Sequence, residues 1–161
     1  MCSICLDSAR FSISNSKRPL FSEYMNSRTV VLKNNIEDIK TMSAFLKEIS
    51  SELNLSMENS FNINLAIEEA VTNIILYAYP QEEEHDFILS VEHSENQLTF
   101  KLIDSGKEFD PTSRPDVDVT LTLEERPIGG LGIFFMRQIM KTVEYQRVDG
   151  KNILTMVKIL D

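Results

Sequence analysis

The sequence predicts an α+β domain, a two-layer sandwich in which helices cover one face of a mixed, mostly antiparallel sheet. Three observations lead to this prediction. Segments with strand character come in adjacent pairs, short polar turns join the members of each pair, and segments with helical periodicity lie between the pairs. Adjacent strands favour hairpins, whereas a doubly wound parallel sheet would need a helix after nearly every strand.

The first half of the chain contains one predicted strand and two predicted helices. Residues 28–33 (RTVVLK) have strand character, and a helix follows to about Ser50, with Asn34 or Asn35 as its N-terminal cap. Residues 60–79 carry too many apolar side chains for a helix on the surface. We expect this segment to be the central, buried helix of the domain.

The second half is predicted to contain two hairpins separated by a helix. Residues 87–93 and 97–104 read as strands joined by a short polar turn. A helix is expected over residues 131–140. Residues 142–148 and 152–160 then form a closing hairpin, because an Asp-Gly pair between them is typical of a tight turn.

Two segments have no predicted regular structure. Residues 104–130 are rich in Pro and Gly and form a connection longer than compact domains usually tolerate without a functional reason, so we expect a lid over a bound ligand. Residues 1–27 are rich in Ser and Asn and show no sustained period, which indicates a poorly anchored extension. The folded domain is therefore predicted to comprise residues 28–161.

Composition and charge exclude several classes of function. The 161 residues, 42% of them hydrophobic, suffice for one domain with a full core. A formal net charge of −9 argues against nucleic acid as a partner, since Lys and Arg side chains drive binding to phosphate backbones. No apolar stretch is long enough to span a membrane and no signal peptide is recognisable, which predicts a cytoplasmic protein. We interpret Cys2 and Cys5 as reduced thiols, with metal or redox use as the alternative.

The central helix carries a polar stripe on an otherwise apolar surface. Glu69 and Asn73 are four residues apart and therefore lie one above the other. Read alone, the pair fits a solvated face, because Glu68 and Asn64 are similar polar neighbours. In a cavity, however, an Asn oxygen can bind Mg²⁺ whose other ligands are waters and phosphates, with Glu69 near an acceptor hydroxyl.

Two further segments could contact a nucleotide. Asp104 follows a strand and precedes Ser105-Gly106, so its carboxylate could accept a hydrogen bond from an exocyclic amine, although Asp-x-Gly is also common in turns. The run GGLG at residues 129–132 opens a helix, where free backbone N–H groups and the helix dipole favour phosphate. A flexible junction between loop and helix is the alternative for this run.

The three segments resemble, in order and approximate spacing, the sequence boxes of the ATP-binding superfamily that includes gyrase, heat-shock chaperone, histidine-kinase and mismatch-repair ATPases. EEAVTN, D-x-G-x-x-F-D-P and GGLG look most like the serine/threonine kinases that act as anti-sigma factors in sporulation and general stress. The similarity covers roughly residues 28–160. It implies a Bergerat-type ATP-binding fold with ATP and Mg²⁺ as ligands.

The resemblance also implies roles for individual residues. Glu69 corresponds to the catalytic base and Asn73 to the Mg²⁺ ligand. Asp104 corresponds to the aspartate that binds adenine, with Gly106 beside the ring.

The lid and the last strand supply the remaining expected contacts. The residues that correspond to the phosphate-binding hinge of the lid are Gly129, Gly130, Leu131 and Gly132. Thr155 is expected to join the network of adenine and water, and Arg126 lies where the lid could bring a positive charge toward the phosphates. Tyr77-Ala78-Tyr79 departs from the His-Gly/Ala-Tyr that is often found in the family.

By this resemblance the expected function is phosphorylation of an anti-sigma antagonist protein, with a sigma factor as the alternative partner. Closure of residues 112–128 over nucleotide could make partner binding depend on ATP or ADP. A homodimer is compatible with the resemblance, although the chain shows no interface pattern. The alternatives are a nucleotide-gated binding module without phosphotransfer and a detached catalytic domain of a histidine kinase.

Overall fold

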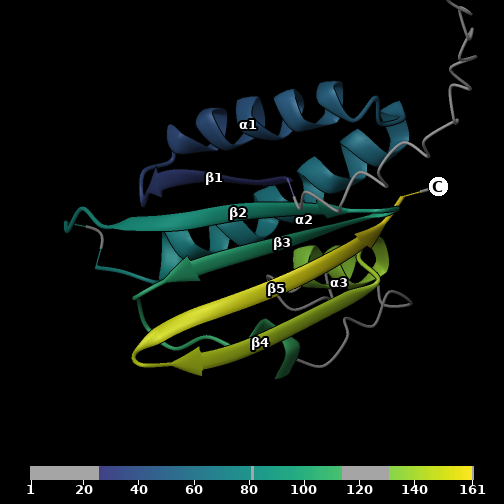
Figure 1. Cartoon of the computed structure of the whole chain (residues 1–161). Coiled ribbons are helices and arrows are strands. Elements are labelled where there is room, and N and C mark those ends of the chain that lie inside the picture. The colour runs from purple at the N-terminus through teal and green to yellow at the C-terminus, as the bar shows by residue number, and fades with distance from the viewer. Residues whose placement is uncertain (1–25, 81, 114–130, 161) are drawn as a thin grey trace, which may run out of the picture.

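The computed structural model describes residues 26–80, 82–113 and 131–160 and consists of one antiparallel sheet with helices on one side (Figure 1). In chain order the elements are β1 (Asn26–Lys33), α1 (Asp38–Glu52), α2 (Met57–Tyr77), β2 (Asp86–Ser94), β3 (Gln97–Asp104), the short 3₁₀ helix η1 (Pro111–Ser113), α3 (Leu131–Ile139), β4 (Thr142–Val148) and β5 (Lys151–Ile159).

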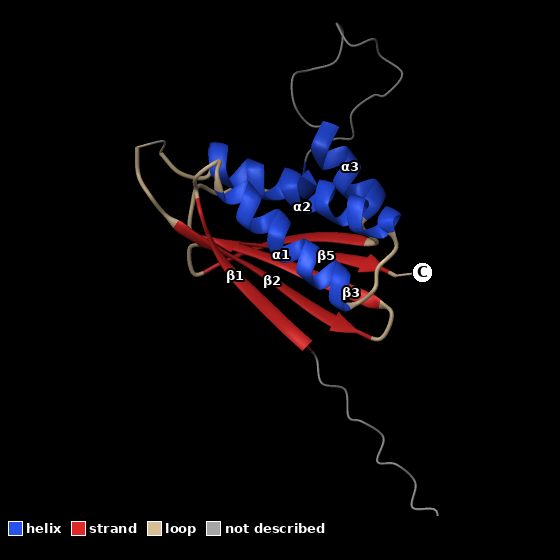
Figure 2. Cartoon of the chain, turned by 90° about the horizontal axis from the view of Figure 1, so that it is seen from above, coloured by secondary structure: helices blue, strands red, loops and turns tan. Residues whose placement is uncertain are grey.

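The sheet has five strands in the order β1-β2-β3-β5-β4, and each neighbouring pair is antiparallel. Seen from above, α1, α2 and α3 all lie over the same face (Figure 2). The α+β two-layer prediction is therefore confirmed, and the described strands contain none of the parallel pairing that a mixed sheet would allow. Both predicted hairpins are present, as β2–β3 and β4–β5.

The core lies between α2 and the sheet. Strand β3 alternates between the two faces, so Leu98, Phe100 and Leu102 point toward the helices and are almost completely buried. From the other layer α2 contributes Ile67 and Val71, both fully buried. Burying one such side chain stabilises the fold by about 1.5–3 kcal/mol relative to leaving it exposed. The predicted central helix is thus the element that fixes the helix layer on the sheet.

The helix starts differ from the sequence prediction. Helix α1 begins at Asp38 with Glu37 as its N-cap, and no side chain caps it. Asn34 and Asn35 were predicted caps, but Asn34 Oδ1 accepts a hydrogen bond from His85 N (2.8 Å), and Asn35 forms a local turn with Glu37 N. Both amides are thus occupied before the helix starts.

Helix α2 begins at Met57, three residues before its predicted start. Ser56 caps it, because the hydroxyl accepts a hydrogen bond from Asn59 N at 3.1 Å. The first turn of α2 has little apolar periodicity, and the serine was the sequence signal for it.

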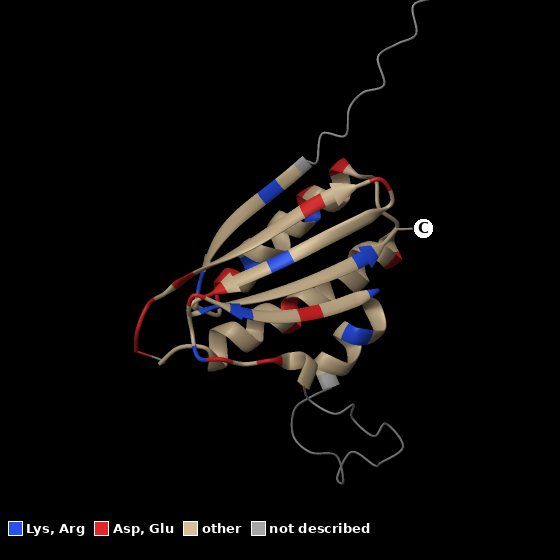
Figure 3. Cartoon of the chain, turned by 60° about the horizontal axis from the view of Figure 1, so that its bottom comes forward, with Lys and Arg blue, Asp and Glu red and all other residues tan. Residues whose placement is uncertain are grey.

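Within the described residues, no helix is both long and apolar enough to cross a bilayer. Figure 3 shows Lys and Arg interspersed with Asp and Glu along the strands of the face that carries no helices. The row Val31, Ile88, Ile103 and Ile153 also lies on this face, each residue directly opposite the next in the strand register.

Candidate nucleotide-binding site

The polar stripe of α2 faces a cavity. Glu69 and Asn73 are half-buried, and the amide of Asn73 lies 3.4 Å from Oε1 of Glu69 in donor geometry. Their neighbours Asn64 and Glu68 form a separate pair, with Nδ2 of Asn64 3.1 Å from Oε2 of Glu68, and neither of these two lines the cavity. The helix therefore presents one carboxylate and one carboxamide together at a concave surface.

Asp104 reaches the same cavity from the sheet. It is the last residue of β3 and shares the inner face with Leu102, which places it on the same side as α2. The residue is only 6% exposed. Its Oδ1 accepts hydrogen bonds from Gly106 N (2.8 Å) and from Nδ2 of Asn152 (2.9 Å), and the described residues supply no hydrogen bond to Oδ2.

The cavity has a volume of about 440 Å³, within the range of small-molecule sites. Its polar groups include Glu69, Asn73 and Asp104, and its apolar lining includes Phe109 and Leu154. The structure thus brings together the three side chains that the sequence had singled out on two separate elements. The apolar walls suit a flat base, and the polar groups lie where a ligand can be oriented.

Two of the predicted glycines lie in close contact with α2: Gly106 lies against backbone atoms, and Gly132 lies against a side chain that could move. A Cβ on Gly106 would lie 2.5 Å from the backbone oxygen of Ala78, so the loop after β3 can pass the end of α2 only with glycine. The neighbouring Lys107 N donates a hydrogen bond to the same oxygen at 2.7 Å. A Cβ on Gly132 would collide with the carboxylate of Glu69. The loop can therefore bring Gly106 N to Oδ1 of Asp104, and the start of α3 at Gly132 can lie against Glu69.

Tyr79 supports the loop after β3. The ring is buried and stacks on His85 with centroids 4.3 Å apart, and its hydroxyl accepts a hydrogen bond from Ser105 N at 2.9 Å. Burial is the main cause of a raised pKa of Tyr79, and the nearby negative charge of Asp104 adds to it. Tyr77 is 68% exposed and makes no such contact. The residue that departs from the family pattern is therefore the exposed Tyr77, and Tyr79, which the pattern shares, is packed next to the site.

Thr155 does not lie in this site. Along β5 the residues that face the helices are Asn152, Leu154 and Met156, and Thr155 lies between them on the opposite face, paired with Lys101 and Glu144. The prediction for Thr155 was wrong about the face of the sheet, because strand side chains alternate. Asn152 occupies the place beside Asp104 instead.

A family model described as the histidine kinase-like ATPase domain matches residues 32–158, which is most of the chain. The chain belongs to this family.

Similar proteins of the family include three that match over most of their length. Serine/threonine-protein kinase BtrW of Bordetella bronchiseptica is 27% identical over 134 residues, covering 82% of this chain and 94% of that protein. Serine-protein kinase RsbW of Listeria monocytogenes is 28% identical over 113 residues, covering 68% of this chain and 72% of that protein. Anti-sigma F factor of Caldanaerobacter subterraneus is 27% identical over 134 residues, covering 75% and 90%.

A solved structure shares the fold. The structure of the RsbU and RsbW domains of Rv1364c from Mycobacterium tuberculosis superposes with a TM-score of 0.62 at 16% identity. The match covers 83% of this chain and 32% of the other, so this chain spans about a third of that multidomain protein.

Part of the predicted lid cannot be compared with the structure. Gly129, Gly130 and Arg126 lie outside the described residues, as does most of the segment 112–128. Leu131 is the first residue of α3, and its side chain is also outside the described set.

The residues that surround Asp104 were not predicted from the sequence. Besides Asn152 these are Tyr145 and Arg147 on β4, which both bond to Asn152. Strand alternation could have identified Asn152, since it shares its face with Leu154 and Met156. The β4 residues have no comparable signal in the sequence, because they meet Asn152 only through the pairing of the last hairpin.

Proposed function

We propose that this protein is an ATP·Mg²⁺-dependent serine/threonine protein kinase that acts as an anti-sigma factor and phosphorylates an anti-sigma antagonist. The observation that carries the proposal is the shared cavity of Glu69, Asn73 and Asp104 in a histidine kinase-like ATPase domain. The names of the relatives support the kinase and the anti-sigma parts of the proposal.

The end of the cavity at Asp104 fits an adenine. Oδ1 of Asp104 already accepts two hydrogen bonds, which leaves Oδ2 to accept one from the 6-amino group of the base. Apolar side chains such as Phe109 and Leu154 line the same cavity and can pack against the faces of the ring.

The end at α2 fits the phosphates and Mg²⁺. The Asn73 amide nitrogen points to Glu69, so its oxygen is the atom available to a cation. Mg²⁺ usually takes only one or two protein ligands when phosphates and water supply the rest, so a single carboxamide is sufficient. When bound, the ion would neutralise charge on the transferred phosphoryl group. Gly132, at the start of α3, lies against Glu69 and brings the N-terminal end of this helix to the same place.

In the transfer step, the Glu69 carboxylate orients the seryl or threonyl hydroxyl of the acceptor protein and accepts its proton. The hydroxyl oxygen forms a bond to the γ-phosphorus, and the bond from that phosphorus to the β,γ-bridging oxygen breaks, which releases ADP. Glu69 is the described carboxylate on α2 that lines the cavity, and Gly132 prevents it from being displaced by a side chain of α3.

The partners of the proposed kinase are proteins. We propose that an antagonist protein supplies the acceptor hydroxyl and that a sigma factor is the alternative partner, so that phosphorylation decides which of the two is held. A cytoplasmic location is part of the same proposal, and a homodimer stays a prediction.

The test is transfer of label from [γ-³²P]ATP to candidate antagonist proteins in the presence of Mg²⁺. We expect labelling on serine or threonine by the wild type and a loss of about 10²- to 10⁴-fold in rate for Glu69→Gln, with the dissociation constant for ATP changed by no more than about threefold. Glu68→Gln is the matched control, since Glu68 is the adjacent carboxylate and bonds to Asn64 outside the cavity. It should label at the wild-type rate.

Two results would contradict the proposal. A wild-type protein that binds ATP·Mg²⁺ yet labels no candidate, even at long times, would favour a nucleotide-gated binding module. Equal loss of labelling in Glu68→Gln and Glu69→Gln would show that the glutamates act through the stability of α2 and that Glu69 has no special part.

A further inference from the structure

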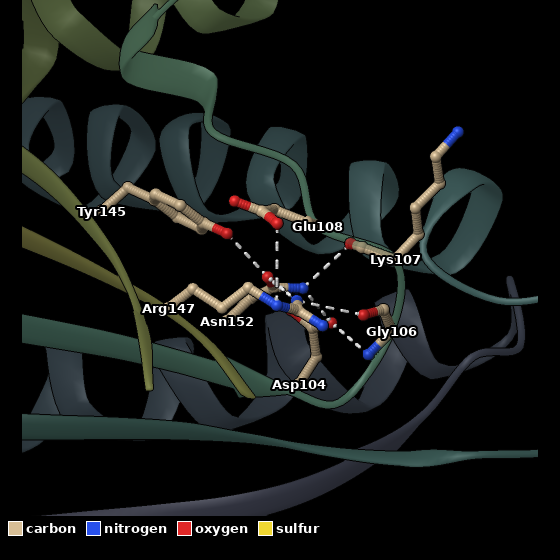
Figure 4. Close-up of polar contacts among 7 residues, drawn as sticks. All are labelled: Asp104, Gly106, Lys107, Glu108, Tyr145, Arg147 and Asn152. Atoms are coloured by element: carbon tan, nitrogen blue, oxygen red, sulfur yellow. Dashed lines mark hydrogen bonds and ion pairs between the residues drawn. The ribbon is translucent and has the colours of Figure 1, made fainter. Parts of the chain in front are cut away.

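Asn152 uses its complete hydrogen-bonding capacity inside the protein. Its Nδ2 donates to Oδ1 of Asp104 (2.9 Å) and to the backbone oxygen of Lys107 (3.0 Å). Its Oδ1 accepts from the hydroxyl of Tyr145 (2.8 Å) and from Nη1 of Arg147 (2.5 Å). Figure 4 shows these contacts converging on the one side chain, which is only 5% exposed.

The partners fix the direction of the amide. A guanidinium only donates hydrogen bonds, and a backbone carbonyl only accepts them. Turning the Asn152 amide over would place its NH₂ group against Arg147 and its oxygen against Lys107 O and Asp104 Oδ1. Such an arrangement would leave buried polar groups unpaired, which is costly. Asn152 therefore always offers an N–H group to Asp104.

This contact sets how Asp104 meets a ligand. With Asn152 and Gly106 N both donating to Oδ1, the carboxylate cannot rotate without losing two hydrogen bonds. Oδ2 is consequently held as a hydrogen-bond acceptor that no described donor occupies. A 6-amino purine has a donor for this atom, whereas a 6-oxo purine would set its own acceptor against it.

The support extends to the loop that follows β3. Arg147 also bonds to the backbone oxygen of Gly106 (3.3 Å), and its Nε lies 3.9 Å from Oε2 of Glu108. Strand β4 thus holds both Asn152 and the loop next to Asp104. The three sequence boxes of the family do not include Tyr145 or Arg147, the two β4 residues that bond to Asn152.

We propose that Asn152, oriented by Arg147 and Tyr145, is a positioning residue that determines base selectivity: it holds Asp104 so that the cavity accepts a 6-amino purine and rejects a 6-oxo purine. The inference rests on the proposed use of ATP at this cavity. Without the Asn152 side chain, water would take its place. Because a water is held less rigidly than the amide, the Asp104 carboxylate could then rotate, Oδ2 would no longer be fixed toward the 6-amino group, and the preference for ATP would fall.

The experiment compares dissociation constants for ATP and inosine triphosphate, both with Mg²⁺, by calorimetry on the full chain. These nucleotides differ at position 6 and in the proton on the adjacent ring nitrogen. We expect the wild type to prefer ATP by at least about tenfold, and Asn152→Ala to lose about tenfold of this preference, mainly through weaker ATP binding.

The matched control is Asn59→Ala. Asn59 is the other buried asparagine among the described residues, at 6% exposure, and lies in the first turn of α2 away from the cavity. It should lower the thermal midpoint and leave the ratio of the two dissociation constants unchanged. If the ratio of the two dissociation constants in Asn152→Ala stays within about twofold of the wild-type ratio, the proposal is overturned and Asn152 has a structural role only.

If Asn152→Ala does not fold, Arg147→Met decides the matter, because Arg147 lies at the surface and its loss removes only one of the four bonds of the amide. A threefold or larger fall in the ATP preference is expected, at about the level of one lost hydrogen bond, and an unchanged ratio overturns the proposal. A wild type that labels an antagonist but does not distinguish the two nucleotides also overturns it and leaves the kinase function intact. If the wild type binds neither nucleotide, that result contradicts the proposed kinase function itself.

Discussion

At the end of the cavity formed by β3 and β5, the chain itself supplies the polar contacts, whereas at the end formed by α2 and α3 the polar side chains have few partners among the described residues. Asn152 has four hydrogen bonds and Asp104 has two, all to protein atoms. Glu69 and Asn73 share one contact of 3.4 Å. If the proposed function is correct, the base-binding end is ordered in advance by contacts within the protein, and the phosphate end gains contacts when its substrates bind.

The largest effect in this comparison is expected from Asp104→Asn at the ordered end. An asparagine would have to place its NH₂ group toward either the two donors at Oδ1 or the amine of the base, and each choice sets donor against donor. We expect the dissociation constant for ATP to rise about 10- to 100-fold, the magnitude of a hydrogen bond to a charged group. Calorimetric titration with ATP·Mg²⁺ measures it.

The control for this change is Asp86→Asn, an exposed carboxylate at the start of β2. It should bind ATP as the wild type does. An unchanged affinity in Asp104→Asn would mean that the base lies elsewhere, and the contrast between the two ends would lose its basis.

A smaller effect is expected at the other end from Gly132→Ala. The added methyl group would displace the Glu69 carboxylate, whose one side-chain hydrogen bond among the described residues is the 3.4 Å contact with Asn73. We expect the rate of phosphotransfer to fall about tenfold, since small misplacements of a catalytic group are costly, with ATP affinity nearly unchanged. Gly150→Ala is the matched control, because Gly150 has a φ of +77° in the β4–β5 turn and contacts nothing in the site. Gly150→Ala should lower the stability of the protein and leave the rate of phosphotransfer unchanged. Equal rates in Gly132→Ala and wild type would show that Glu69 needs no fixed position.

The smallest effect concerns pH and Tyr79. The raised pKa means that the folded protein holds the phenol proton more tightly than the unfolded chain does. Stability from this source is complete below the unfolded pKa of about 10 and is lost as the pH rises from there through the folded value. Tyr79→Phe should therefore show a shallower decline in the free energy of unfolding between about pH 9 and 11, measured by urea denaturation. A parallel decline in both proteins would contradict the assigned cause.

Most of the fold followed from periodicity and turn residues. The apolar density of α2 predicted the buried central helix, the polar turn between β2 and β3 predicted the first hairpin, and the Asp149-Gly150 turn predicted the last one. The helix start at Asp38 was less accessible, because capping depends on which side chains are free and Asn34 is bonded to His85. The start at Met57 had a signal in Ser56, but apolar periodicity did not extend to it.

The site was predictable where its residues belong to one local pattern. Glu69 and Asn73 share a helix face, and Asp104 ends a strand. Read alone, the pair fits a solvated face and the aspartate fits a turn, so it was the order and spacing of the three segments together, and the family resemblance that they carry, that indicated these residues. The contacts of Asn152 with Tyr145 and Arg147 depend on the register of β4 on β5 and on how that hairpin meets the loop after Asp104. The resemblance indicated Thr155 by residue type, but strand alternation places Thr155 on the face of β5 opposite the cavity.

The bond between Lys107 N and the oxygen of Ala78 ties the C-terminal end of α2 to the loop beside Asp104. Glu69 lies nine residues earlier on the same helix, a separation of about 13 Å along its axis. In the proposed complex, the distance between the adenine and the transferred phosphoryl group is therefore set by the length of this part of α2. A single residue inserted between them would turn Glu69 by about 100° around that axis, so the length of this interval is as tightly constrained as the identity of the residues at its two ends.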